Sequence, residues 1–192
     1  MAGKQAKVLS DPHINQLLSY ARKSRYPKRN RVIVLLSVKA GMRAGEIAQL
    51  TWPMVLAASG DIANSIAIED RIAKKRSGRR IPMHASLRAA LIALRRDSSG
   101  EGPVARSERG GGAMTSNSVV NWFAKAYQAL GLEGCSSHSG RRTFITRAAR
   151  VVHKAGGSLR DVQLLAGHQS IITTQRYIDG DSDAQRRLVA LI

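Results

Sequence analysis

The sequence predicts a mostly helical α+β domain with one small antiparallel β-sheet. Apolar residues recur at helical spacing through most of the chain, as in Ile14, Leu17 and Ala21. Residues 64–83 differ, because two short extended pieces flank a turn signal at Ser77-Gly78. A length of 192 residues fits a single domain over residues 1–192, with residues 1–9 expected to be flexible.

The first half of the chain predicts three helices and the sheet. Ser10 can cap a first helix, whose first turn holds an aspartate and a proline. That helix is expected to end before the basic cluster at residues 22–31. A second helix is expected over residues 31–39, ending at Gly41, and a third from Ala44 until Trp52-Pro53. The strands are expected at residues 65–68 and 80–83, with a basic tip between them.

The second half predicts further helices around one long loop. Residues 97–115 are rich in Gly, Ser, Pro and Arg, which is typical of an exposed loop. The segment could be a domain boundary, but we favour a loop inside one domain because each flanking piece is small. Helices are expected at residues 86–95, 118–130, 140–155, 158–166 and 183–192, and a short one before Tyr177.

The charge predicts a polyanionic partner. The net charge is +18, so nucleic acid is the first candidate and an anionic membrane the second. An aromatic content of 4% argues against a single-strand binder built on stacking. The single cysteine, Cys135, excludes an internal disulfide framework and a thiolate-rich zinc site. Neither a signal region nor a membrane-spanning run is present in the sequence, which predicts a cytoplasmic protein.

Three short segments carry candidate chemistry. Arg43 follows a turn at Gly41 and precedes Glu46, which can hold the guanidinium as a phosphate clamp. His138 and Arg141 are three residues apart on a predicted helix and can bind and protonate a phosphoryl group together. The third segment contains the last two candidates, His168 and Tyr177. Taken singly, each also fits an ordinary role: a solvated ion pair, a basic helix start, a buried histidine or a half-buried tyrosine.

Together, these segments resemble the catalytic domain of the tyrosine recombinases, the phage integrase family. The segment LLAGHQSIITTQRYID is similar to the family's stretch from its second active-site histidine to its nucleophilic tyrosine. SSHSGRRTFITRAA is similar to its histidine–arginine helix, and SVKAGMRAGEIAQLTW to the segment with its first arginine. KKRSGRRIPM is similar to its lysine-bearing β-hairpin. The resemblance begins at about Ser10 and continues to the C-terminus.

The resemblance implies a site-specific recombinase that cuts and rejoins DNA through a 3′-phosphotyrosyl intermediate. Tyr177 would be the nucleophile, and Arg43, Arg141 and His168 would stabilise the phosphate charge. His138 would exchange the tyrosine proton. Lys74 would protonate the leaving oxygen; it lies eight residues before Pro82, the family's usual spacing, and Lys75 is the alternative. No cofactor and no metal are expected.

The resemblance also implies the partners. Double-stranded DNA is expected, contacted by the basic segments 22–31, 74–80 and 147–154, together with self-association on DNA and accessory DNA-binding proteins. The C-terminal helix would pack either on a neighbouring copy or on its own domain. The usual N-terminal DNA-binding domain is not in this sequence, which fits a minimal member of the family, a remnant, or an excised piece of a longer protein. Gly140 departs from the large apolar residue usual in the family, and Arg142 from its frequent histidine.

Two other functions fit the same motifs. One is a DNA-binding relative that no longer cuts and acts as an accessory protein; the missing N-terminal domain favours it, and the intact active-site set disfavours it. The other is a type IB topoisomerase, which shares the active site; the small size and the order of hairpin and helices disfavour it.

Overall fold

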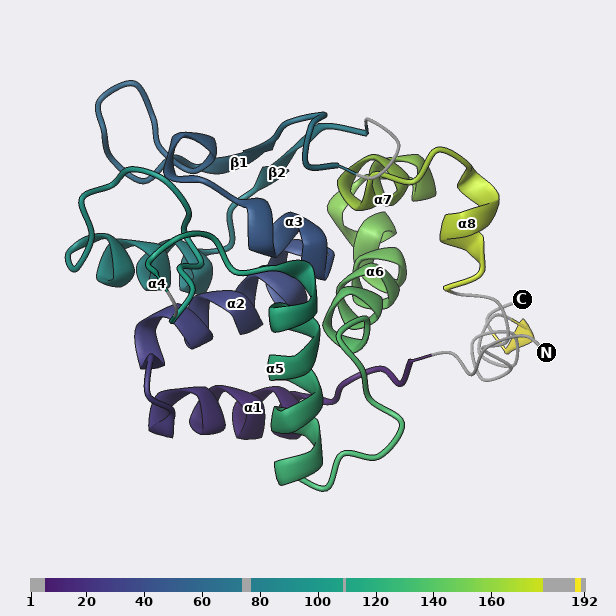
Figure 1. The fold of residues 1–192 in the computed structure, drawn as a ribbon. Coiled ribbons are helices and arrows are strands. Elements are labelled where there is room, and N and C mark those ends of the chain that lie inside the picture. The colour runs from purple at the N-terminus through teal and green to yellow at the C-terminus, as the bar shows by residue number, and fades with distance from the viewer. Residues whose placement is uncertain (1–5, 74–76, 109, 178–188, 191–192) are drawn as a thin grey trace.

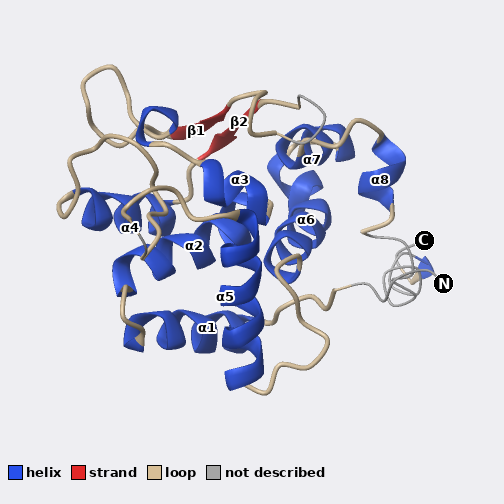
Figure 2. Cartoon of the chain, in the orientation of Figure 1, coloured by secondary structure: helices blue, strands red, loops and turns tan. Residues whose placement is uncertain are grey.

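The computed structural model describes residues 6–73, 77–108, 110–177 and 189–190. Helices dominate these residues, and the strands form one two-stranded sheet (Figure 2). The α-helices are α1 (Asp11–Lys23), α2 (Pro27–Ala40), α3 (Ala44–Gln49), α4 (Ala85–Arg95), α5 (Ser116–Ala129), α6 (Ser139–Val151), α7 (Leu159–Ala166) and α8 (Ile171–Gln175). Short 3₁₀ turns follow α3 at Trp52–Met54 and α6 at Val152–Ala155. This confirms the predicted fold class.

Helix α2 lies at the centre of the molecule, against α1, α4 and α6 (Figure 1). Its apolar residues from Val32 to Ala40 are all buried, and they join the main core with side chains from α1, α3, α4 and α5. A second, smaller cluster lies between α6 and α7, and Tyr177 packs against it. Helix α2 also packs against α6, and Gly140 at the start of α6 lies beside Ser37 and Val38 near the end of α2.

The β-hairpin pairs β1 (Ser65–Ile68) with β2 (Arg79–Pro82) in antiparallel register, with Ile66 opposite Ile81. It lies near α3 and the end of α7 (Figure 1). The second strand begins one residue before the expected position. Ile81 is buried and Arg80 is exposed, so alternate side chains of β2 face opposite ways. This alternation places Arg79 on the inner face.

Helix α2 begins four residues earlier than predicted, inside the basic cluster. Pro27 stands at its first position, where a missing N–H costs nothing. Arg29 is buried, because its guanidinium donates hydrogen bonds to the Arg106 carbonyl at 2.9 Å and to Glu108 at 3.2 Å. Part of the cluster is therefore structural, and a charge count could not reveal these partners.

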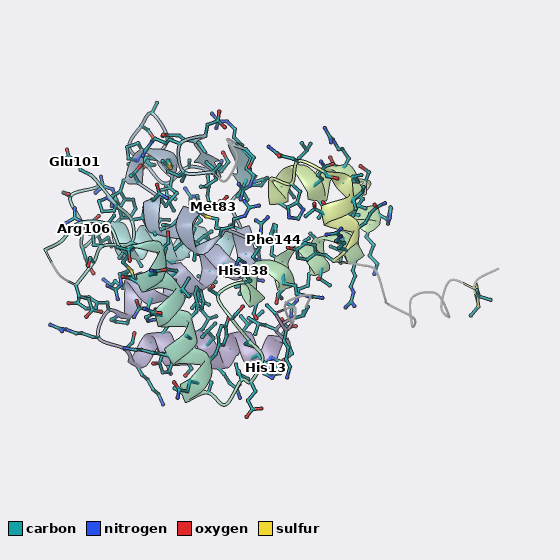
Figure 3. The ribbon with its side chains drawn as sticks, turned by 45° about the vertical axis from the view of Figure 1, so that its right-hand side comes forward. His13, Met83, Glu101, Arg106, His138 and Phe144 are labelled. Carbon is teal, nitrogen blue, oxygen red and sulfur yellow. The ribbon has the colours of Figure 1, made fainter. Side chains whose placement is uncertain are left out.

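Segment 97–115 contains turns and isolated bridges in its described residues. Val104 and Ala105 are nevertheless buried in the main core, and the Val104 N–H donates to the Leu50 carbonyl. The expectation of a wholly exposed loop is therefore wrong for these two residues. Figure 3 shows Glu101 and Arg106 of this segment at the side of the molecule away from His138.

The structure tests only part of what the sequence predicts for the two ends of the chain. Of residues 1–9, Leu9 is buried, and its N–H donates to the Thr143 hydroxyl at 2.8 Å. The predicted C-terminal helix at 183–192 lies outside the described residues, except for 189 and 190. Among the helices that the structure describes, none has the length and apolar content needed to cross a membrane.

Gly140 allows α6 to approach α2 closely. A Cβ atom at Gly140 would lie 2.2 Å from the Ser37 hydroxyl oxygen and 2.9 Å from its Cβ. We therefore expect Gly140→Ala to lower the free energy of unfolding by about 1–3 kcal/mol, the usual cost of overpacking. Denaturant unfolding measures this, and adding Ser37→Gly should restore part of the loss. An unchanged or raised stability of the single variant would contradict this packing.

Candidate active site

The first arginine lies where α2 ends and α3 begins. Gly41 ends α2 with a φ of 61°, and a Cβ there would lie 2.4 Å from the Phe144 ring. Both facts require glycine at this turn. Arg43 then caps α3: its N–H donates to Glu46 Oε2 and its guanidinium to Glu46 Oε1, both at 2.9 Å. Glu46 is 1% exposed, so a solvated surface pair is excluded.

The Glu46 carboxylate binds a second arginine from the hairpin. Arg79 donates from both terminal nitrogens to the two Glu46 oxygens, each at 3.0 Å. Burial alone would raise the pKa of Glu46, but the hydrogen bond and charge of Arg79, with those of Arg43, outweigh burial and lower the pKa. The expectation that Arg79 belongs to an outward phosphate-binding tip is wrong, because its side chain is 6% exposed and faces the carboxylate.

Arg141 joins three parts of the chain beneath the site. It lies on the first turn of α6, and its guanidinium donates to the Gly41 carbonyl at 2.6 Å and to the Ala166 carbonyl at 2.7 Å. The same group lies 3.0 Å from Nε2 of His168. Burial, and next the charge of Arg43, lower the pKa of Arg141 to about 10, so it stays cationic at neutral pH.

His168 follows the left-handed glycine that ends α7, and both ring nitrogens have partners. Arg141 can only donate, so Nε2 accepts, and Nδ1 carries the proton and donates to the Thr174 hydroxyl at 2.9 Å. The ring stacks on Tyr177, with centroids 5.5 Å apart. Burial, and then the charges of Arg141, Arg43 and Arg79, lower the pKa of His168 to about 4. The imidazole is neutral at neutral pH.

This lowered pKa predicts an acid-sensitive fold. An unfolded histidine takes up a proton near pH 6.5, whereas His168 in the folded chain does so only near pH 4. Stability from the neutral ring is therefore complete above pH 6.5 and falls as the pH drops towards 4. For a half-exposed ring we expect a loss of about 1–2 kcal/mol after solvent screening. Unfolding at stepped pH should show a shallower decline for His168→Asn; identical profiles would contradict this.

His138 and Tyr177 open onto a shared pocket. His138 is the exposed N-cap residue of α6, three positions before Arg141 (Figure 3). The pocket has a volume of about 260 Å³ and is lined by Ala6, His138, Arg141, Arg142, Thr173, Arg176 and Tyr177. Three arginines around one half-buried tyrosine give the pocket a positively charged lining, which suits an anion.

The structure thus brings together five of the six predicted site residues: Arg43, His138, Arg141, His168 and Tyr177. Lys74 and its alternative Lys75 lie outside the described residues. Sequence reasoning missed Arg79 and Thr174. Strand alternation, which places Arg79 on the same face as Ile81, was the available signal for the first. For Thr174, which lies on α8, the available signal was its position six residues after His168.

The comparisons with known proteins show the family of this chain. The model of the phage integrase family matches residues 7–183. The chain belongs to the phage integrase family. Tyrosine recombinase XerC of Xanthomonas campestris pv. campestris (strain B100) is 29% identical over 150 residues, which are 78% of this chain and 44% of that protein. The chain therefore spans less than half the length of the curated relatives it matches.

Solved structures show the same fold for this phage integrase family member. The Tn1549 transposon integrase in complex with a circular intermediate DNA has a TM-score of 0.74 at 17% identity, covering 100% of this chain and 67% of that one. XerH recombinase bound to palindromic difH substrate has a TM-score of 0.75 at 20% identity, covering 99% and 54%. A lambda integrase dimer bound to a core site has a TM-score of 0.69 at 21% identity, covering 95% and 50%.

Proposed function

We propose that this phage integrase family member cuts and rejoins double-stranded DNA at specific sites through a 3′-phosphotyrosyl intermediate. One observation carries the proposal. Arg141, His168 and Tyr177 come from different elements yet form one chain of contacts, with 3.0 Å between the first pair and stacked rings in the second. A phenol beside fixed cations is the arrangement that nucleophilic attack on a phosphodiester requires.

Each side chain has a role in this reaction. The Tyr177 oxygen attacks the phosphorus and gives its proton to His138. Arg43 and Arg141 bind the nonbridging oxygens, on which negative charge builds, and His168 donates to one of them after the phosphate replaces its contact with Arg141 or Thr174. The bond from phosphorus to the 5′ oxygen then breaks, and that oxygen takes a proton from the hairpin lysine, Lys74 or Lys75. The products are a 3′-phosphotyrosine and a free 5′-hydroxyl.

Rejoining reverses these steps. A 5′-hydroxyl attacks the phosphotyrosine, and Tyr177 leaves with a proton returned by His138. Because one phosphoester bond is exchanged for another, the bond energy is kept and ATP is not needed. The arginines supply the positive charge that a metal ion supplies in other phosphoryl-transfer enzymes. We therefore propose a reaction without a cofactor, and double-stranded DNA as the partner on which copies of the chain pair.

A covalent-adduct assay tests the proposal. Duplexes that tile the DNA flanking its gene, each with one nick, lose the 5′-hydroxyl fragment after cleavage and trap the covalent complex. We expect a DNA band that resists detergent and disappears with protease, formed in the presence of a chelator and without ATP. If the protein binds the duplexes but forms this band on none of them, the result would support an accessory DNA-binding protein instead.

A further inference from the structure

Arg79 occupies an unusual position among the basic residues of the hairpin. Its side chain is 6% exposed, whereas Arg80 beside it is exposed. Its two terminal nitrogens both bind Glu46, and its Nε donates to the Leu165 carbonyl at 2.8 Å. One guanidinium thus spans three elements, β2, α3 and α7. These bonds use three of its five N–H groups, and the buried side chain faces Glu46 and α7, so Arg79 is not an exposed cation like its neighbour Arg80.

The bonds of Arg79 end on neighbours of the site residues. Glu46 is also the partner of Arg43, so both arginines depend on one carboxylate. Leu165 directly precedes Ala166, whose carbonyl receives Arg141, and lies three residues before His168. The close fit extends to Gly167, where a Cβ would lie 2.9 Å from a terminal nitrogen of Arg79. Movement of Arg79 would therefore disturb both Arg43, through Glu46, and the turn that carries His168.

We infer that Arg79 is a positioning residue, which fixes the distance between Arg43 on α3 and the His168 turn after α7. The inference deepens the proposed function and rests on it for its catalytic consequence. Arg79 does not touch the reacting atoms; it acts through Glu46 and the Leu165 carbonyl. Without Arg79, Glu46 would bind Arg43 alone. The end of α7 would lose the hydrogen bond from Arg79 to the Leu165 carbonyl and would keep only the one from Arg141 to the Ala166 carbonyl.

A lysine cannot replace this geometry. Its single ammonium keeps the charge beside Glu46, but it cannot bind both carboxylate oxygens in a fork and also reach the Leu165 carbonyl. Arg79→Lys therefore keeps the positive charge beside Glu46 and removes the contacts that hold α3 and α7 in place. The matched control is Arg71→Lys, because Arg71 precedes the same strand and pairs with Glu69 but is 59% exposed.

Two measurements test the role. In a cleavage assay at saturating DNA, we expect Arg79→Lys to form adduct at least about tenfold more slowly than wild type, with DNA affinity within about twofold. Nitrogen NMR shifts of the His168 ring report its tautomer without any DNA. The wild-type ring should be fixed with the proton on Nδ1, and Arg79→Lys should show a mixture of tautomers. Arg71→Lys should match wild type in both.

The outcomes separate this inference from the proposed function. An adduct rate within twofold of wild type, or an unchanged tautomer, would overturn the positioning role of Arg79. If wild type itself forms no adduct, the proposed function fails, and the tautomer alone then decides the inference. Thermal unfolding identifies a variant that does not fold; in that case Arg79→Gln, with a shorter planar side chain, is measured against the same limits.

Discussion

Tyr177→Phe should abolish the covalent DNA adduct and leave DNA binding intact. Only the phenolic oxygen can attack the phosphorus, and phenylalanine lacks it. The ring itself remains, so it can still stack on His168 and pack against the cluster between α6 and α7. The arginines that we propose bind the phosphate are unchanged. A suicide duplex measures the adduct, and a binding isotherm on the same duplex measures the affinity.

The matched control for this variant is Tyr20→Phe. Tyr20 lies edge-on to Trp122 on the main core, with ring centroids 6.2 Å apart, and belongs to the packing of α1 against α5. It should form adduct at the wild-type rate. An adduct formed by Tyr177→Phe would show that another group is the nucleophile.

Arg141→Lys should have the second largest effect. The guanidinium holds two backbone carbonyls and the His168 ring at once, from α6 to the ends of α2 and α7. Lysine carries the charge on one nitrogen and cannot hold these groups or grip two phosphate oxygens together. We expect adduct formation to fall at least about tenfold, which corresponds to roughly 1.4 kcal/mol of barrier.

A conservative change at a partly buried arginine elsewhere is the control for this variant. Arg88 on α4 donates to the Ile62 carbonyl at 3.1 Å, away from the site residues. Arg88→Lys should keep the wild-type adduct rate. If Arg141→Lys also cleaves at the wild-type rate, Arg141 has only a structural role.

Local patterns predicted much of this fold. The Ser10 cap, the antiparallel pairing of β1 with β2 and the pairing of Arg43 with Glu46 all depend on residues close in sequence, where spacing determines which groups meet. Ser77-Gly78 lies directly before β2, at the end of the connection between the strands. The family motifs then predicted which distant side chains would gather. The start of α2 was predicted too late because residues 22–31 look like a solvated basic cluster in the sequence. The groups that bind the Arg29 guanidinium inside the structure lie 77 and 79 residues away.

The contacts between elements could not be predicted in the same way. Arg141 binds carbonyls 100 and 25 residues away. Every residue has a backbone carbonyl, so the sequence does not indicate which one accepts a hydrogen bond. The sequence predicts that Arg79 belongs to the basic tip of the hairpin, because charge alone does not distinguish a buried arginine from a solvated one. Its partner, Glu46, lies 33 residues earlier and had already been assigned to Arg43.

The point of covalent attachment tests the account most directly. The adduct from the suicide duplex is digested with protease and nuclease, and mass spectrometry identifies the modified residue and the DNA end that it carries. We predict one linkage, from Tyr177 to a 3′-phosphate, with a free 5′-hydroxyl on the released strand. Attachment at Tyr20, Tyr26 or Tyr127, or through a 5′-phosphate, would contradict the account.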